Sequence, residues 1–204
     1  EDAVELVQEM IIHRHPKTIG LGIDYRETNH EPENFWKAFK LAKEAGFKIT
    51  IHAGEFGEHW RNVETSLKLL GADRIDHGYT IIDNPELAEE AHRNDVHFAV
   101  VPTNSYYLRT FTDEEWAYKH PVKKMAEFGL KIFPNSDDPT MHQVSISESW
   151  LLMFNFLGFS LEDLRKMLEN SIEAAWVDEA TKKEWKRDWL LEFDKLAKKL
   201  PSLA

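Results

Sequence analysis

Lys48-Ile49-Thr50-Ile51-His52-Ala53-Gly54-Glu55 is the stretch that decides the fold of this 204-residue chain. It begins with apolar and β-branched side chains, which are typical of a buried strand, and Gly54 then permits a close turn. A histidine and a glutamate stand where the strand runs out into a loop. Parallel α/β barrels collect their catalytic groups at this position, the carboxyl ends of the strands. The stretch therefore predicts a parallel sheet with a functional site at its edge.

Two further stretches place chemically useful groups at strand ends. Arg74-Ile75-Asp76-His77-Gly78 repeats the histidine and glycine, and Asn135-Ser136-Asp137-Asp138-Pro139 follows another apolar run. A single His-Gly pair is weak evidence, and an Asp pair before proline is also typical of a turn or a helix N-cap. Adjacent carboxylates repel each other unless a cation or a proton separates them. A divalent metal on Asp137, with Asp138 facing a substrate, would relieve this repulsion. In an extended backbone the two side chains point in different directions.

Helical and strand patterns alternate along the chain with short connections. We expect an opening helix, then strands at 18–24, 47–52, 74–77, 96–102 and 130–134. Helices are expected at 33–45, 62–70, 85–93, 121–128, 147–157, 161–170 and 182–199. Five strand-then-helix units without hairpins predict an α/β fold with an all-parallel sheet, either closed as a barrel or open. No linker or repeat divides the chain, so residues 1–204 are expected to form a single domain.

The composition excludes several functions. With 25 Lys and Arg against 36 Asp and Glu, the net charge of −11 argues against nucleic acid or an anionic membrane surface as the main partner. The absence of cysteine excludes disulfides and thiol nucleophiles, so any metal must be held by His, Asp or Glu. There is no apolar run long enough for a membrane span, and no signal-peptide core or nucleotide-binding glycine loop, so a cytoplasmic location is the default expectation.

His52 and Glu55 suit metal-assisted acid–base chemistry. Neutral imidazole is a good zinc ligand, and a carboxylate held nearby can act as general acid or base. The alternative is a buried histidine beside an N-capping glutamate. His13 and His15 fall at a helix end before Pro16, where the helix dipole alone favours histidine. The remaining histidines are expected to be mostly solvated: His30, His59, His92, His97, His120 and His142, of which His59 and His142 lie nearest the motif loops.

The combination of His52-Ala53-Gly54-Glu55, His77-Gly78 and Ser136-Asp137-Asp138-Pro139, in this order, resembles the adenosine deaminase family. The resemblance covers nearly the whole chain. It implies the last five βα units of a (β/α)8 TIM-type barrel, followed by C-terminal helices. It also implies an enzyme that uses one zinc ion to hydrolyse the exocyclic amino group of a purine and release ammonia.

The resemblance further implies a role for each motif residue. His52 and Asp137 would bind zinc, Glu55 would protonate the ring nitrogen beside the attacked carbon, and His77 would orient the attacking water. The residues that would bind the purine are Gly54 and Asp138.

Two departures from the family pattern affect these expectations. The family's His-x-His pair on its first barrel strand has no counterpart, so we expect the first three βα units and two zinc ligands to be absent. The chain alone should then bind zinc weakly and be inactive until a missing N-terminal barrel segment is supplied in cis or in trans. Tyr25-Arg26-Glu27-Thr28-Asn29 also replaces the Leu-Ala-Gly loop of adenosine-specific enzymes. Adenosine, adenine and an N6-substituted purine therefore all stay open as substrates.

Two other functions remain as alternatives. One is a different metal-dependent amidohydrolase on the same barrel, because fold does not fix the reaction. The loop at 25–29 and the segment 103–110 would decide between substrates. The other alternative is a ligand-binding or partner-binding domain that keeps the motifs without a complete site.

Overall fold

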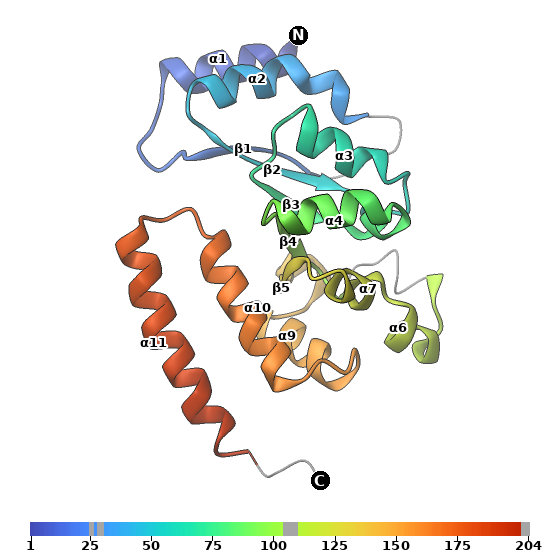
Figure 1. The fold of residues 1–204 in the computed structure, drawn as a ribbon. Coiled ribbons are helices and arrows are strands. Elements are labelled where there is room, and N and C mark those ends of the chain that lie inside the picture. Colours follow the sequence, from blue (N-terminus) through green and yellow to red (C-terminus); the bar gives the residue numbers. More distant parts are fainter. Residues whose placement is uncertain (25–26, 28–30, 104–109, 201–204) are drawn as a thin grey trace.

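The computed structural model describes residues 1–204 except 25–26, 28–30, 104–109 and 201–204 (Figure 1). Its sheet has five strands: β1 (Gly20–Ile23), β2 (Lys48–Ala53), β3 (Arg74–His77), β4 (His97–Val100) and β5 (Lys131–Pro134). They lie in sequence order, and every neighbouring pair is parallel. The predicted parallel arrangement of five consecutive strands is confirmed.

The helices that connect and follow these strands agree with the expected sequence of elements. The described helices are α1 (Asp2–Ile12), η1 (Pro32–Phe35), α2 (Trp36–Glu44), α3 (Arg61–Lys68), η2 (Tyr79–Asp83), α4 (Pro85–Arg93), α6 (Asp113–Lys119), α7 (Pro121–Glu127), α8 (Pro139–His142), α9 (Ile146–Asn155), α10 (Leu161–Ala174) and α11 (Glu179–Ala197). Three short ones, η2, α6 and α8, were not expected. They are too short for an apolar period to show, although α6 begins with a capping box between Thr112 and Glu115.

The two faces of the sheet differ in polarity. In β2, Ile49, Ile51 and Ala53 are buried in the hydrophobic core that the helices cover, while the alternating residues lie on the other face. That second face is polar. Thr50 donates a hydrogen bond to Asp76, and Arg74 Nε donates to Thr50 Oγ1 at 3.3 Å. Because side chains alternate between the two faces along the strand, His52 lies on this same polar face.

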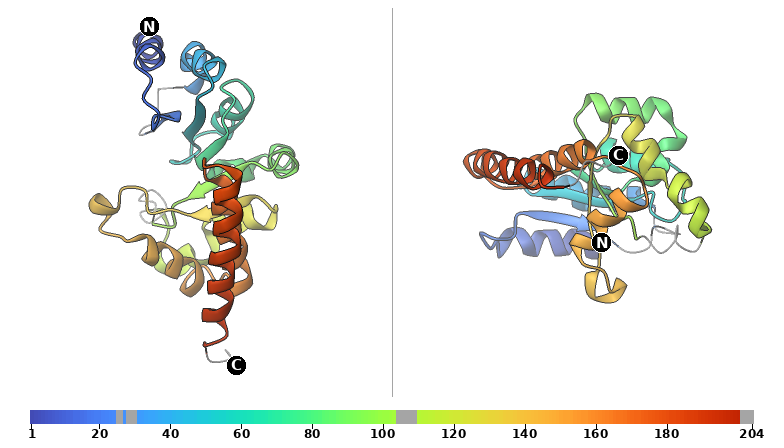
Figure 2. Two further views of the ribbon diagram at one scale, coloured as in Figure 1. Left: turned by 90° about the vertical axis from the view of Figure 1, so that its left-hand side faces the viewer. Right: turned by 90° about the horizontal axis from the view of Figure 1, so that it is seen from below.

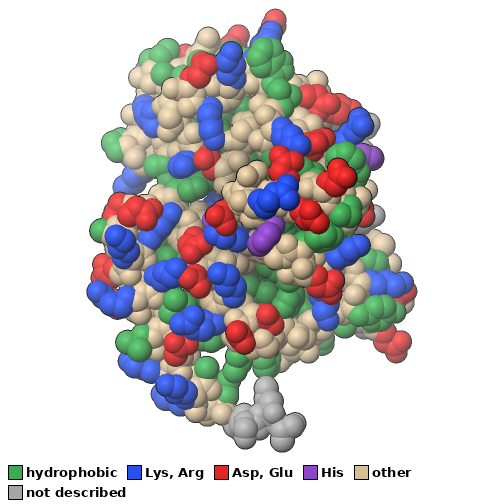
Figure 3. All heavy atoms as spheres, viewed as in Figure 1, with side chains coloured by type: hydrophobic (Ala, Val, Ile, Leu, Met, Phe, Trp, Pro, Cys, Tyr) green, Lys and Arg blue, Asp and Glu red, His purple; other side chains and the backbone are tan. Residues whose placement is uncertain are grey.

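The C-terminal helices α10 and α11 lie side by side (Figures 1 and 2). Arg165 joins them through two bonds to Asp194, of 2.7 and 3.2 Å. Asn170 of α10 donates to the carbonyl of Ile132 in β5 at 2.9 Å, which fastens this helix pair to the sheet. Acidic and basic side chains are interspersed over the face drawn in Figure 3. In the part of the chain that the structure describes, every helix is too short or too polar to cross a lipid bilayer.

Candidate active site

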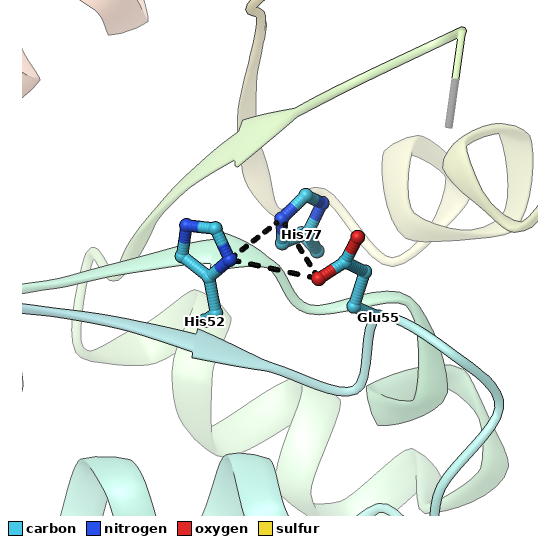
Figure 4. Close-up of side chains that lie close together, drawn as sticks. All are labelled: His52, Glu55 and His77. Carbon is cyan, nitrogen blue, oxygen red and sulfur yellow. Dashed lines mark hydrogen bonds and ion pairs between the residues drawn. The ribbon is translucent and has the colours of Figure 1, made fainter. Parts of the chain in front are cut away.

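Two histidines meet because their strands are adjacent and parallel. His52 stands near the end of β2 and His77 ends β3, and Ala53 pairs with His77 in the register of the two strands. His52 Nδ1 lies 3.2 Å from His77 Nε2. The Glu55 carboxylate faces both rings, with Oε2 at 3.5 Å from His52 Nδ1 and 3.4 Å from His77 Nε2 (Figure 4). The structure thus brings together three of the side chains that the sequence singled out.

Glycine and unusual backbone angles shape this cluster. Gly54 has φ +70°, and a Cβ there would lie 2.3 Å from Thr80 Oγ1, so only glycine fits the turn that returns Glu55 toward the rings. His77 itself has φ 69°, a left-handed conformation that is uncommon for a residue with a side chain. The hydrogen bond from Gly78 N to Ala53 O, 2.9 Å long, holds the end of β3 against β2 in this conformation.

The two histidines have opposite pKa shifts. His77 is 1% exposed, and burial, together with the nearby charge of His52, holds its pKa well below the ordinary value. Burial also lowers the pKa of His52, but the hydrogen bond that its ring donates to Glu55 and the charges of Asp76, Glu55 and Asp137 outweigh it and raise the pKa. The pair therefore combines a neutral imidazole with one that charges more readily.

A second group of possible metal ligands lies beyond β5. Ligand atoms of Asp137, Asp138 and His142 come within 4.8 Å of one another. Asp137 has φ 56°, and Asn135 Oδ1 accepts hydrogen bonds from the amides that follow it, including that of Asp137 at 3.2 Å. The extended backbone expected at this Asp pair is therefore wrong: the chain turns sharply at Asp137, and Asp138 is exposed.

The pKa of the Asp137 carboxyl group is affected by His52, which belongs to the cluster at the ends of β2 and β3. Burial raises the pKa of Asp137, the charge of His52 lowers it, and the neighbouring Asp138 raises it again. His52 and Asp137 thus lie near enough for the charge of each to shift the pKa of the other. They belong to two separate clusters of possible metal ligands, His52 with Glu55 and His77, and Asp137 with Asp138 and His142. His52 makes both of its contacts through Nδ1, and its Nε2 points away from Glu55 and His77 (Figure 4).

Some side chains near the site were missed or wrongly placed from sequence. His120 was expected to be solvated, but it is 1% exposed: its Nδ1 accepts from Val122 N, which caps α7. His142 joins the Asp pair. Glu27 was named only as part of the 25–29 loop, and nothing in the sequence indicated its contacts with the turn at Gly54 and Glu55, because these partners are distant in sequence. The other loop residues proposed to select the substrate, 25–26, 28–29 and 104–109, lie outside the described residues.

Comparison with known proteins agrees with this fold. Residues 1–188 match the family model of adenosine deaminase. An adenine deaminase from Cupriavidus necator is 34% identical over 185 residues, which cover 91% of this chain and 51% of the relative. An adenine deaminase from Rhizobium meliloti is 29% identical over 184 residues, or 90% of this chain and 56% of that one. The chain spans about half the length of these curated relatives.

Two solved structures share the fold. A zinc-bound amidohydrolase from Burkholderia ambifaria is 53% identical with a TM-score of 0.94, covering 97% of this chain and 54% of that one. The adenine deaminase of Arthrobacter aurescens is 26% identical with a TM-score of 0.85, covering 95% and 57%. The predicted fold class, consecutive βα units of a larger α/β barrel, is confirmed. On the match of 188 of its 204 residues, the chain belongs to the adenosine deaminase family.

Proposed function

We propose that this protein hydrolyses the exocyclic amino group of a purine, with adenine as the preferred substrate and one zinc ion as cofactor. The observation that carries the proposal is the convergence of His52, Glu55 and His77 at the ends of two parallel strands. The curated relatives named adenine deaminase favour adenine among the purines that the sequence leaves open. The zinc-bound amidohydrolase supports the choice of metal.

The residues present fit a zinc ion. Imidazole nitrogen and carboxylate oxygen are zinc ligands, and the Nε2 of His52 points away from the ring's two existing contacts. We assign His52 and Asp137 as ligands from this chain, and further ligands to a segment of the protein outside it. Zinc bound there would supply a Lewis acid that makes water nucleophilic near neutral pH.

Glu55 and His77 divide the proton chemistry. In its protonated form Glu55 can donate to the ring nitrogen beside the attacked carbon, which makes that carbon more electrophilic. His77 is buried and neutral, so its imidazole can orient the attacking water and accept a proton from it. Glu55 Oε2 lies 3.4 Å from His77 Nε2, so the two groups act on the same small volume.

The purine would be held at the mouth of the site. Asp138 is exposed beyond β5, where its carboxylate can accept a hydrogen bond from a purine N–H. We also assign Gly54 to purine binding, through the backbone of the turn between β2 and Glu55, whose tight packing against Thr80 requires glycine. Overall, a bond forms between the oxygen of water and the ring carbon, and the bond from that carbon to the exocyclic nitrogen breaks. One hydrogen of the water leaves with the amino group as ammonia, and the other stays on the oxo-purine.

The test uses the full-length product of the gene that encodes this chain, loaded with zinc. Ammonia release is measured with adenine, adenosine and N6-methyladenine, together with a simple amide. We expect adenine to react fastest, its activity to disappear after chelation, and zinc to restore it. Activity on the amide alone would favour another amidohydrolase. A protein that takes up no zinc at saturating supply, and releases no ammonia from any purine, would contradict the proposal.

A further inference from the structure

Glu27 is a buried carboxylate outside the residues assigned above. It lies in the loop after β1, and its exposed fraction is 8%. Its Oε2 accepts a hydrogen bond from Gly54 N at 2.7 Å, and its Oε1 accepts one from Glu55 N at 2.7 Å. Asn62 Nδ2 donates a third, also to Oε2, at 2.9 Å. One side chain from a distant loop thus binds two successive backbone amides.

This arrangement fixes the orientation of the peptide that leads into Glu55. A carboxylate whose two oxygens hold neighbouring amides leaves the peptide between them little freedom to rotate. From the other side, Gly54 packs against Thr80, where even a methyl group would not fit. The turn is therefore held between Glu27 and Thr80. The Glu55 side chain leaves it in the direction of His52 and His77.

The chemistry of Glu27 argues for a role beyond packing. Burying a carboxylate is unfavourable unless it is hydrogen-bonded or paired with charge. Within the described part of the chain, the partners of Glu27 are neutral N–H groups, and two of the three belong to the turn that carries Glu55. An apolar residue would fill the same space, but it would leave both backbone amides without an acceptor.

We propose that Glu27 is a positioning residue that holds the Glu55 carboxyl group where it can transfer a proton to the substrate. The inference rests on the proposed function, because it concerns the same site. Through these bonds, a residue that follows β1 is joined to the turn that follows β2.

Glu27→Gln is the direct test, because the amide keeps the size of the side chain and replaces one acceptor oxygen with a donor. One of the two backbone amides then loses its acceptor. We expect kcat for adenine to fall about 10- to 100-fold, with zinc content and KM little changed. Glu33→Gln, an exposed glutamate in η1 near the same loop, is the matched control and should keep wild-type kcat.

A double-mutant cycle separates positioning from general structural damage. If Glu27 acts through Glu55, Glu27→Gln should have little further effect on the residual activity of Glu55→Gln. Equal fold losses in the two backgrounds would overturn the inference. Glu27→Asp keeps both acceptor oxygens and should recover part of the lost kcat. It also provides the cycle with a folded variant if the glutamine variant is unstable.

Amide hydrogen exchange tests the same contact without relying on activity. The amides of Gly54 and Glu55 should exchange faster in Glu27→Gln than in the wild type, while those of β3 stay protected. Faster exchange with unchanged kcat would also overturn the positioning role. Failure of the proposed function shows itself separately, since the wild-type protein would then release no ammonia from purines in the first place.

Discussion

His77 has two features that are each energetically unfavourable for a histidine. Its backbone is left-handed, at φ 69°, and its ring is buried, with no hydrogen-bond partner for Nδ1 in the described part of the chain. Residues other than glycine that adopt left-handed conformations cluster at functional sites, where the surrounding structure holds the backbone in place. Burial keeps the pKa of His77 low, so the ring stays neutral at the pH where an attacking water must lose a proton.

Glu55→Gln tests the role of the neighbouring carboxyl group at this scale. The amide keeps the shape of the side chain but has no acidic proton, so kcat should fall by at least about 100-fold, the usual contribution of a general acid. Steady-state kinetics on adenine and metal analysis of the same sample measure the two effects. Zinc content should be unchanged, because Glu55 is assigned as a proton donor and not as a ligand.

The control for that variant is Glu86→Gln, which changes an exposed glutamate in the first turn of α4. It should keep both turnover and metal. If Glu55→Gln instead lost zinc in proportion to activity, Glu55 would be a metal ligand and the division of roles between Glu55 and His52 would be wrong.

At the scale of elements, the strands and the longer helices could be predicted because their signals are local. The range 74–77 for β3 and 85–93 for α4 match the structure, the latter because Pro85 stands at the first helical position and Asn84 caps it. Short elements such as α8 have no period to detect. His120 was misjudged because its position before Pro121 indicates a loop, while its burial depends on packing against Tyr79 and Trp116.

In the candidate site too, the residues with a local sequence signal could be predicted, and those that depend on contacts distant in sequence could not. The strand-end pattern was enough to select His52, Glu55 and His77, because parallel strands bring their carboxyl ends to one edge. The roles of these residues stay predictions. Glu27 could not be found from sequence, since its bonds to the turn span 27 and 28 residues and leave no local pattern. The bend at Asp137 was also missed, because an apolar run before it favours extension.

Asn170→Ala tests how α10 is fastened to the sheet. Asn170 is 3% exposed, and its Nδ2 donates to the Ile132 carbonyl of β5 at 2.9 Å. Removing the donor leaves a buried carbonyl without this bond, so the free energy of unfolding should fall by about 1 to 3 kcal/mol. Urea unfolding followed by circular dichroism measures the change. Asn155→Ala, at the exposed end of α9, is the control and should stay close to wild type. Equal stability of both variants would show that the bond contributes nothing.

At the scale of the whole molecule, buried histidines link stability to pH. Burial lowers the pKa of His77, His97 and His120, the last to about 3. When the chain unfolds, each ring returns to water and to an ordinary pKa near 6.5. The unfolded state then binds more protons than the folded state at mildly acidic pH, and protonation favours unfolding. Acid should therefore weaken the fold well before its carboxylates are neutralised.

His120 isolates this effect because it can be replaced by a residue that caps but does not titrate. Its stabilising contribution is present above pH 6.5 and is lost as the pH falls toward about 3, because its folded pKa lies below its unfolded pKa. In His120→Asn, the side-chain oxygen can still accept the hydrogen bond from Val122 N. The smaller side chain leaves a cavity, which lowers the free energy of unfolding by the same amount at every pH. Between pH 7 and pH 5 the wild type should therefore lose about 2 kcal/mol more stability than His120→Asn.

Urea unfolding at half-unit steps of pH measures this difference. His59→Asn is the matched control, because His59 Nδ1 also accepts a backbone N–H two residues along the chain, at 3.2 Å, but from an exposed position. Its stability curve should run parallel to that of the wild type across the same range, while the curve of His120→Asn converges on the wild type as the pH falls. Parallel curves for His120→Asn and the wild type would mean that His120 is not a buried neutral base. The acid sensitivity of the fold would then have to arise elsewhere.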